Sequence, residues 1–301
     1  MIPDPLRRAA ENVMAAHRGQ HESVVQAFPV GGGCISNGTL LRFSSDRFAF
    51  LKWNWNSPAR MFHCEAAGLK AMRPATSLRI PEVYGVADAT DLCPPLILME
   101  AANTGKVTPR SGEFDDQLAQ GLAKLHSATS QTFGFSDDNF IGPTPQPNPS
   151  SKSWPEFFCE HRLNHMLNLL TNARAMDSTD RRTAARFAER VTPLLQATAE
   201  APSLLHGDLW GGNVLATDDG LPALIDPACY YGHREADLAM TQLFGGFSPR
   251  FCAAYREVHP LQDGYGDRFE IYNVYHLLNH ALLFGGGYLA QAMTVMKRFA
   301  G

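Results

Sequence analysis

The segment HGDLWGGN at residues 206–213, followed by LIDPA at residues 224–228, carries the pattern that decides the fold. It presents Asp208, then Asn213 five positions later, then Asp226 after a short hydrophobic stretch. This order is typical of the catalytic and metal-binding loops of eukaryotic-like kinases. Asp208 would be the catalytic base that orients an attacking hydroxyl group, and Asn213 and Asp226 would hold Mg²⁺ against the phosphates of ATP. Turn formation among glycines is the alternative explanation for these residues.

A glycine-rich segment further upstream, VGGGCISNG at residues 30–38, predicts a loop over the phosphates of a nucleotide. Backbone N–H groups without side chains can approach phosphate oxygens closely, so Gly31, Gly32 and Gly33 are candidate ATP-binding residues. The segment has Ser36 where the last glycine of G-x-G-x-x-G would stand, and it lacks the Gly-Lys-Ser/Thr ending of a Walker A loop. An ordinary hairpin turn would use the same residues.

Lys52 and Glu65 are predicted to form a buried ion pair. Phe48, Phe50 and Lys52 share one face of a strand because side chains alternate along it. Glu65 lies on the apolar stripe of the following helix. An unpaired buried charge of either sign would be costly, so each residue is the natural partner of the other. As in kinases, the pair would direct Lys52 at the α- and β-phosphates of ATP, whereas two separate solvated charges are the alternative.

The order of the predicted elements indicates an α+β protein with two lobes, the bilobal protein-kinase-like fold. Residues 1–101 are expected to form a small nucleotide-binding lobe with an antiparallel sheet and one helix, and residues 102–301 a larger, mainly helical lobe that carries the catalytic loop. The predicted strands cover residues 39–43, 48–53, 82–86 and 96–100, and the predicted helices cover residues 58–73, with Ser57 as N-cap, 114–128, 154–172, 179–199, 265–284 and 287–298.

The last predicted strand of the small lobe would lead into the hinge between the lobes. Its end, LMEA at residues 98–101, makes the backbone groups of Glu100 and Ala101 candidates for hydrogen bonds to adenine. An ordinary buried strand would explain the same four residues nearly as well.

The composition is that of a globular protein, with 45% hydrophobic residues in a chain of 301. No apolar run approaches the ~20 residues of a membrane helix. The net charge is −4 and the 26 basic residues are scattered, which argues against nucleic acid or an anionic membrane as partner and favours a small-molecule substrate. The first residues, MIPDPLRRAAEN, lack the apolar core of a secretory signal, and the six cysteines form no C-x-x-C pair, so we expect a cytoplasmic protein with reduced thiols.

Five segments resemble the signatures of the fructosamine kinase (ketosamine-3-kinase) family, within the wider aminoglycoside-phosphotransferase-like superfamily. They are FGFSDDNFIGPTPQPN at residues 133–148, HGDLWGGN at 206–213, IDPACYYGHREADLAM at 225–240, LFGGF at 243–247 and YHLLNHALLFGGGY at 275–288. The likeness runs from Gly31 to Tyr288. The HGDxxxxN pattern alone would also admit choline and antibiotic kinases, and Trp210 with the Tyr-Tyr-Gly-His-Arg-Glu run narrows the choice.

The resemblance implies an ATP- and Mg²⁺-dependent phosphotransferase that phosphorylates the 3-hydroxyl group of ketosamines, the adducts that sugars form with amines. The phosphorylated adduct would break down spontaneously and free the amine, which makes the activity a deglycation repair. The sugar stays open among ribulosamine, erythrulosamine and fructosamine, on a free or a protein-bound amine, as does the choice between monomer and homodimer. The alternatives are a kinase for an aminoglycoside, choline or homoserine, and a nucleotide-binding pseudokinase.

Four residues near the catalytic loop are candidates for substrate binding. The indole of Trp210 could stack on the sugar ring or on the apolar part of the adduct, and a place in the core is its alternative. His233, Arg234 and Glu235 follow the metal ligand and could bind substrate hydroxyl groups or the amine. A salt-bridged surface turn is the alternative for these three residues.

Three further residues have two explanations each. Cys34 falls within the phosphate loop, where related kinases carry a cysteine that can form inter-subunit disulfides, so it is a candidate for redox regulation or a small buried residue. His276 and His280 are four positions apart on a predicted helix, which is a metal-ligand spacing. Without a third ligand a pocket wall or a core position is preferred over zinc.

The catalytic loop departs from that of protein kinases in a way that bears on regulation. Gly207 stands in place of the arginine of H-R-D, and eleven positions separate Asp226 from Asp237. That spacing leaves little room for a phosphorylated activation loop. We therefore expect constitutive activity, with Asp237 anchoring the catalytic loop by hydrogen bonds.

Overall fold

The computed structural model describes residues 2–31, 35–106, 109–110 and 112–301. Gly32, Gly33 and Cys34, candidates for nucleotide binding and redox regulation, lie outside the described residues. The first part of the chain forms α1 (Asp4–Arg18), β1 (Val24–Val30), β2 (Asn37–Phe43), β3 (Phe48–Trp53), α2 (Met61–Met72), a 3₁₀ turn (Arg73–Ala75), β4 (Val83–Ala87) and β5 (Leu96–Glu100).

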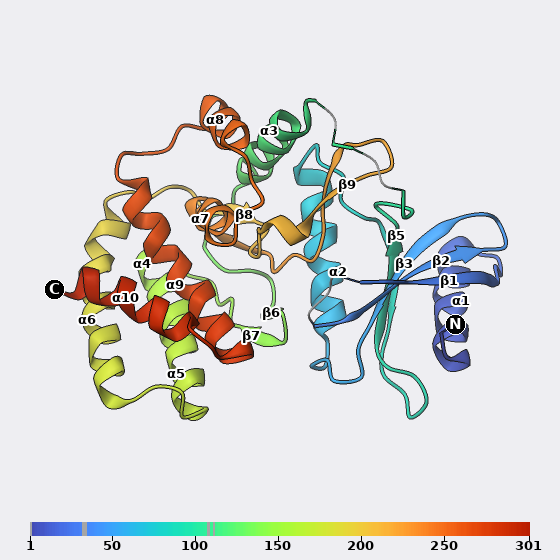
Figure 1. Cartoon of the computed structure of the whole chain (residues 1–301), viewed down its shortest axis with the longest axis horizontal. Helices are drawn as coiled ribbons and strands as arrows, with labels where there is room; N and C mark the ends of the chain where they lie inside the picture. The colour runs from blue at the N-terminus through green and yellow to red at the C-terminus, as the bar shows by residue number, and fades with distance from the viewer. Residues whose placement is uncertain (1, 32–34, 107–108, 111) are drawn as a thin grey trace.

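The rest of the chain is mainly helical (Figure 1). Its helices are α3 (Phe114–His126), α4 (Trp154–Phe158), a π-helical stretch (Cys159–Asn164), α5 (His165–Asn172), α6 (Ser178–Gln196), a 3₁₀ turn (Gly211–Asn213), α7 (Glu235–Leu243), α8 (Pro249–Val258), α9 (Tyr265–Phe284) and α10 (Tyr288–Ala300). Its short strands are β6 (Asn139–Ile141), β7 (Thr144–Gln146), β8 (Ser203–Leu205), β9 (Val214–Ala216), β10 (Pro222–Leu224) and β11 (Tyr230–Gly232).

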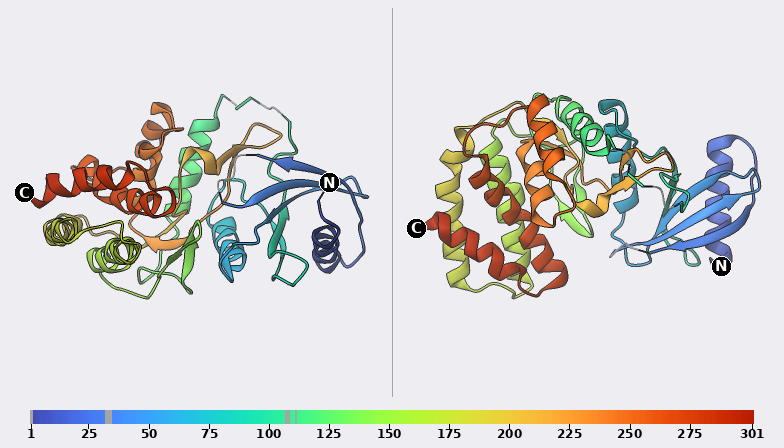
Figure 2. Two further views of the ribbon diagram at one scale, coloured as in Figure 1. Left: turned by 60° about the horizontal axis from the view of Figure 1, so that its bottom comes forward. Right: turned by 45° about the horizontal axis from the view of Figure 1, so that its top comes forward.

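The small lobe is a five-stranded antiparallel sheet with one helix on each face. The strand order is β1-β2-β3-β5-β4. Side chains alternate along β5, so Leu96 and Leu98 pack with α1 while Ile97 and Met99 join the core that includes α2. Figures 1 and 2 show α1 on the outer side of the sheet and α2 between the sheet and the helical lobe. The inner face of the sheet is therefore the one that faces the helical lobe.

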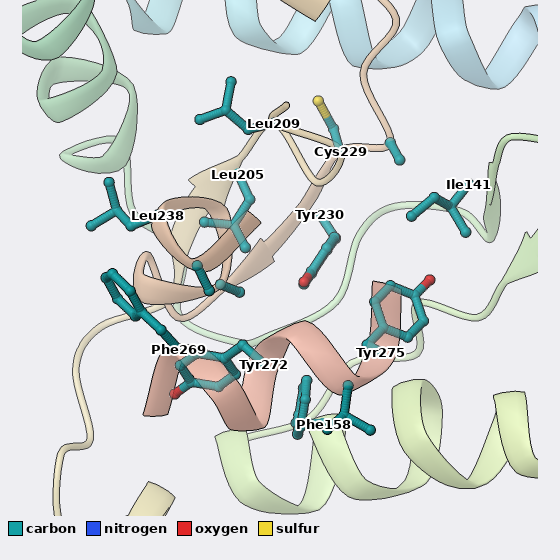
Figure 3. Close-up of a cluster of buried hydrophobic side chains, with 14 of the residues drawn as sticks. Ile141, Phe158, Leu205, Leu209, Cys229, Tyr230, Leu238, Phe269, Tyr272 and Tyr275 are labelled. Atoms are coloured by element: carbon teal, nitrogen blue, oxygen red, sulfur yellow. The ribbon is translucent and has the colours of Figure 1, made fainter. Parts of the chain in front are cut away.

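The helical lobe is held by one continuous apolar core around α9. Phe158, Leu205 and Tyr272 are each at most 1% exposed and converge from three different elements. Figure 3 shows these side chains gathered above and below the α9 ribbon. Two antiparallel pairs, β8 with β11 and β9 with β10, are attached to this core and bracket residues 206–213 and 225–229.

Most of the predicted elements are present. The β2–β3 hairpin pairs as predicted, and α9 has the predicted bounds. The start of α2 was wrong: Ser57 donates its hydroxyl to Asn54 O in a turn, and the helix begins only at Met61, after Arg60 in a left-handed conformation. Neither α1 nor β1 had been expected as an element. No described helix is both long and apolar enough to cross a bilayer.

Helix α1 provides the first testable prediction, because its apolar stripe is the outer core of the small lobe. Met14 is fully buried on this stripe. Met14→Ala removes its buried methylene groups and leaves a cavity, which is expected to lower the free energy of unfolding by about 2–4 kcal/mol. Urea denaturation followed by tryptophan fluorescence would measure the change. Arg8→Ala, at an exposed position of the same helix, is the control and should behave as wild type.

Candidate active site

The catalytic loop is anchored by a buried carboxylate at the start of α7. Asp237 Oδ2 accepts a hydrogen bond from His206 N at 2.7 Å, and Asp237 Oδ1 accepts one from Gly207 N at 2.8 Å. The ring of His126 lies 3.2 Å from the same carboxylate. Burial alone would raise the pKa of Asp237, but the hydrogen bonds and the nearby histidines lower it below its usual value. The prediction that Asp237 anchors this loop is confirmed.

Gly207 explains why the loop carries no arginine at this position. Its φ angle is +82°, and a Cβ placed on it would fall 2.0 Å from the carbonyl oxygen of Ala228. No side chain fits in that space. The Ala228 N–H in turn donates to His206 O at 2.8 Å. The catalytic loop and the loop after Asp226 are therefore packed backbone against backbone, which fixes their spacing.

Asp208 and Asn213 are joined across the catalytic loop. Asn213 Nδ2 donates to Asp208 O at 2.8 Å and to Asp208 Oδ2 at 3.1 Å. Neither bond uses the amide oxygen of Asn213. Removal from water raises the pKa of Asp208 to about 7, against the opposing effect of the Asn213 hydrogen bond. A carboxylate with such a pKa is suited to accept a proton near neutral pH.

Lys52 links the two lobes at the site. Its ammonium group lies 2.9 Å from Glu65 Oε2 on α2 and 2.9 Å from Asp226 Oδ1. The predicted Lys52–Glu65 ion pair is therefore present, and Asp226 is a second partner that sequence had not indicated. Burial alone would lower the pKa of Lys52, but these two carboxylates raise it above its usual value, so the side chain is a cation.

The residues present fit a magnesium ion. The Asp226 side chain is partly exposed. The residue before it, Ile225, donates its N–H to Asn213 O at 3.1 Å, which brings the backbone of Asn213 close to Asp226. One carboxylate and one amide oxygen are hard oxygen ligands of the kind that Mg²⁺ accepts together with phosphate oxygens and water. The metal-binding role of both residues stays our prediction.

The two hinge candidates, Glu100 and Ala101, differ in whether their polar groups are free to bind adenine. The Glu100 carboxylate contacts Arg79 and the Glu82 backbone, and Glu100 N donates to Glu82 O at 2.7 Å. Glu100 thus has partners for both its side chain and its N–H within the protein. Ala101 lies just past the end of β5 and is the better candidate for adenine. Gly31, at the described edge of the glycine-rich segment, has open space around its Cα.

The structure does not support substrate binding by the His-Arg-Glu run. His233, Arg234 and Glu235 are 0%, 2% and 0% exposed. Arg234 forms an ion pair with Glu200, and Glu235 forms one with Arg268 at 2.6 Å. The ring of His233 contacts Thr198 O at 2.9 Å. All three side chains thus have partners within the interior of the helical lobe. They are neither substrate ligands nor a surface turn.

Trp210 is half-buried and follows Asp208 by two positions. It belongs to a cluster of aromatic side chains that the sequence had not indicated. The ring of Phe244 meets Trp210 edge-on at 6.4 Å and lies 4.5 Å from the ring of His280, which is 5.2 Å from Tyr288. The segments LFGGF and FGGGY, which contain Phe244 and Tyr288, were the available signal. Burial lowers the pKa of His276 to about 3, so this neighbour of His280 on α9 is a neutral core histidine.

Five of the six cysteines lie in the described part of the chain, and all five are free thiols. Cys64, Cys93, Cys159, Cys229 and Cys252 form no disulfide. Burial raises the pKa of the Cys229 thiol well above its usual value, which makes this residue unreactive. The redox role proposed for Cys34 stays a prediction, since that residue lies outside the described part of the chain.

Comparison with known proteins gives consistent matches over the whole chain. The fructosamine kinase family model matches residues 6–300. A probable ketoamine kinase from Synechocystis sp. is 38% identical over 98% of this chain and 97% of that protein. The chloroplastic protein-ribulosamine 3-kinase of Oryza sativa subsp. indica is also 38% identical, over 93% of this chain and 80% of that protein. A crystal structure from Haemophilus somnus, provisionally named a fructosamine-3-kinase, aligns with a TM-score of 0.85 at 28% identity over 96% of each chain.

The raised pKa of Asp208 predicts an unusual dependence of stability on pH. Its folded-state pKa of about 7 lies above the roughly 3.9 of an unfolded aspartate, so the folded chain binds this proton more tightly than the unfolded chain. The ionised carboxylate therefore destabilises the fold above about pH 7, and the penalty disappears as the pH falls toward 4. Asp208→Asn should raise the Tm of the metal-free protein at pH 8, with a gain that shrinks between pH 7 and pH 4.

Thermal melts at half-unit pH intervals would measure this gain. Asp91→Asn, at an exposed position, is the matched control and should show no comparable trend. Equal Tm values for Asp208→Asn and wild type across the whole range would contradict the assignment of an unfavourable buried charge to Asp208.

Proposed function

The chain belongs to the fructosamine kinase family, and we propose that it transfers the γ-phosphate of ATP to the 3-hydroxyl group of ketosamines. The names of its relatives support this acceptor class, since one is a ketoamine kinase and another a protein-ribulosamine 3-kinase. Ribulosamine, erythrulosamine and fructosamine adducts are all candidates, on free or protein-bound amines. The activity would be a deglycation repair in the cytoplasm.

The observation that carries the proposal is the convergence of the proposed catalytic residues from both lobes. Lys52 from β3 reaches Asp226 at 2.9 Å, and Asn213 joins the Asp208 carboxylate at 3.1 Å. A pseudokinase needs no such set. The simultaneous presence of a buried lysine, a base and two oxygen ligands favours phosphoryl transfer over nucleotide binding alone.

Asp208 would act on the acceptor. Its carboxylate orients the 3-hydroxyl of the sugar and accepts the proton as the bond from that oxygen to the γ-phosphorus forms and the bond to the β-phosphate oxygen breaks. Lys52 would hold the α- and β-phosphates once they displace Asp226 from it. A magnesium ion bound by Asn213 and Asp226 would neutralise charge on the phosphates. Trp210 would cover the sugar or the amine part of the adduct.

Loss of the base gives a direct test. Asp208→Asn removes the proton acceptor and keeps the shape of the side chain, so turnover is expected to fall by about two to four orders of magnitude. ADP release in a coupled assay would measure it, and unchanged circular dichroism would show that the fold is kept. Turnover within a factor of three of wild type would exclude Asp208 as the base.

An acceptor panel tests the substrate class. Ribuloselysine, fructoselysine, free ribulose, an aminoglycoside, choline and homoserine would each be supplied with ATP and Mg²⁺. We expect the ketosamines to support ADP release at kcat/KM values at least a hundredfold above those of the other acceptors. An aminoglycoside, choline or homoserine as the best acceptor would replace the proposed substrate, and ATP binding without turnover of any acceptor would favour a pseudokinase.

A further inference from the structure

The segment FGFSDDNFIGPTPQPN at residues 133–148 has no part in the chemistry described so far. It forms the β6–β7 hairpin of the helical lobe. At the tip of the hairpin lies Gly142, where a Cβ would fall 2.7 Å from Cδ1 of Ile35, the first described residue after the glycine-rich gap. The hairpin tip therefore touches the small lobe beside the proposed phosphate loop.

Two buried amides at the base of the hairpin bind the backbone of the loop that follows Asp226. Asn139 Nδ2 donates to Cys229 O at 2.7 Å, and Gln146 Nε2 donates to Ala228 O at 3.1 Å. Asn139 is 6% exposed and Gln146 is 1% exposed, so water does not compete for these bonds. The two carbonyl groups belong to the second and third residues after the proposed metal ligand.

A second layer of side chains fixes the two amides. Tyr275 OH donates to Gln146 Oε1 at 2.8 Å, and Gln146 Nε2 also donates to Asn139 Oδ1 at 2.8 Å. Asn148 Nδ2 donates to Asn139 Oδ1 at 2.9 Å, and Arg162 Nη2 donates to Asn148 Oδ1 at 2.7 Å. Figure 3 shows Tyr275 on the side of α9 that faces the hairpin. We call these five residues the hairpin network.

Arg162 closes the network with a fully buried charge. It lies in the π-helical stretch, is 0% exposed and donates hydrogen bonds to Pro147 O, His161 O and Asn148 Oδ1. Its guanidinium lies 4.0 Å from the ring centre of Tyr230 and 4.7 Å from that of Phe157, and these faces offset part of the desolvation cost. A displacement of the network would therefore take hydrogen-bond partners away from a buried charge.

Asp226 needs such support because its backbone is strained. Its φ angle is +56°, a left-handed conformation that is unfavourable for a residue with a side chain. Pro227 follows and has no N–H with which to hold the loop. Ala228 is the first residue after it with an N–H that can do so: this N–H donates to His206 O, and the Ala228 carbonyl oxygen accepts from Gln146 Nε2. Strained residues persist only where the surroundings over-determine them.

We propose that the hairpin network positions the metal-binding loop, and that Gln146 is the positioning residue that acts on Asp226 through the Ala228 carbonyl group. The inference rests on the proposed function in one respect, that Asp226 is a magnesium ligand. It does not depend on which acceptor is phosphorylated.

The test compares two variants of the hairpin network, of which only one removes the hydrogen bond to the Ala228 carbonyl group. Gln146→Met keeps the length of the side chain and removes the bond to Ala228 O together with the bonds to Asn139 Oδ1 and from Tyr275 OH. Tyr275→Phe removes one hydroxyl group, leaves the Gln146 amide free to bind Ala228, and serves as the matched control. Both variants should lower Tm, because each leaves a buried polar group without a partner. ATP binding, measured by calorimetry without acceptor over a Mg²⁺ series, should require about tenfold more Mg²⁺ in Gln146→Met alone, the effect of one lost hydrogen bond.

Turnover gives a second readout. In Gln146→Met, kcat should fall about tenfold while the acceptor KM stays within twofold of wild type, because neither Asp208 nor Trp210, the residues proposed to face the acceptor, belongs to the hairpin network. Equal Mg²⁺ requirements in the two variants, or a wild-type requirement in Gln146→Met, would overturn the proposal. If Gln146→Met does not fold, Gln146→Asn, whose amide is too short to reach Ala228, should show the same raised requirement.

The outcome separates this inference from the proposed acceptor. A wild-type protein that binds ATP with Mg²⁺ but phosphorylates no ketosamine would refute the acceptor class and leave the positioning test intact. A Gln146→Met protein that needs no extra Mg²⁺ would refute the positioning role in a protein that is still a ketosamine kinase.

Discussion

The ammonium group of Lys52 lies 2.9 Å from one carboxylate oxygen of Glu65 and 2.9 Å from one of Asp226. One cation is shared by two carboxylates where the strand β3, the helix α2 and the loop after Asp226 meet, and burial there raises the pKa of Glu65 to about 7. A divalent cation near Asp226 would compensate the charge of that carboxylate, and phosphate oxygens near Lys52 would take its place. The site is thus poised for an exchange of partners in which Lys52 keeps Glu65 and gives up Asp226.

That exchange requires Asp226 to stay in place when Lys52 no longer contacts it. The contacts that hold the backbone of its loop must therefore fix its position. The loop after Asp226 is held from one side by the catalytic loop, through the hydrogen bond to His206 O and the close packing of Ala228 on Gly207, and from the other side by Gln146. Asp237 then fixes the catalytic loop to α7. Because α7 begins at Glu235, the chain passes from the proposed metal ligand Asp226 to the anchoring helix without a long intervening segment. The geometry is built into the fold, which agrees with an enzyme that needs no phosphorylation to be active.

Sequence sufficed where the physical cause is local. Alternation along β3 placed Lys52 on the inner face, and helical spacing placed Glu65 opposite to it, because both follow from the repeat of a single element. The bounds of α9 could likewise be found from its apolar pattern. The start of α2 could not, since Ser57 has the residue type of an N-cap but Asn54 takes its hydroxyl into a turn. A competing local hydrogen bond decided the boundary.

The role of a residue could not be predicted where its hydrogen-bond or ion-pair partners come from distant parts of the chain. A charged run beside the proposed metal ligand suggested contact with substrate. Arg234 instead pairs with Glu200 and Glu235 with Arg268, each more than thirty positions away, and these pairs make burial of the run possible. The same reasoning explains Gln146. An amide between two prolines is typical of an exposed loop, and only the fold brings the Ala228 carbonyl to one side of it and the Tyr275 hydroxyl to the other. A primary amide can satisfy both partners, because it donates to the carbonyl group and accepts from the hydroxyl group. An apolar side chain could satisfy neither. The geometry of the hairpin therefore requires an amide at this position.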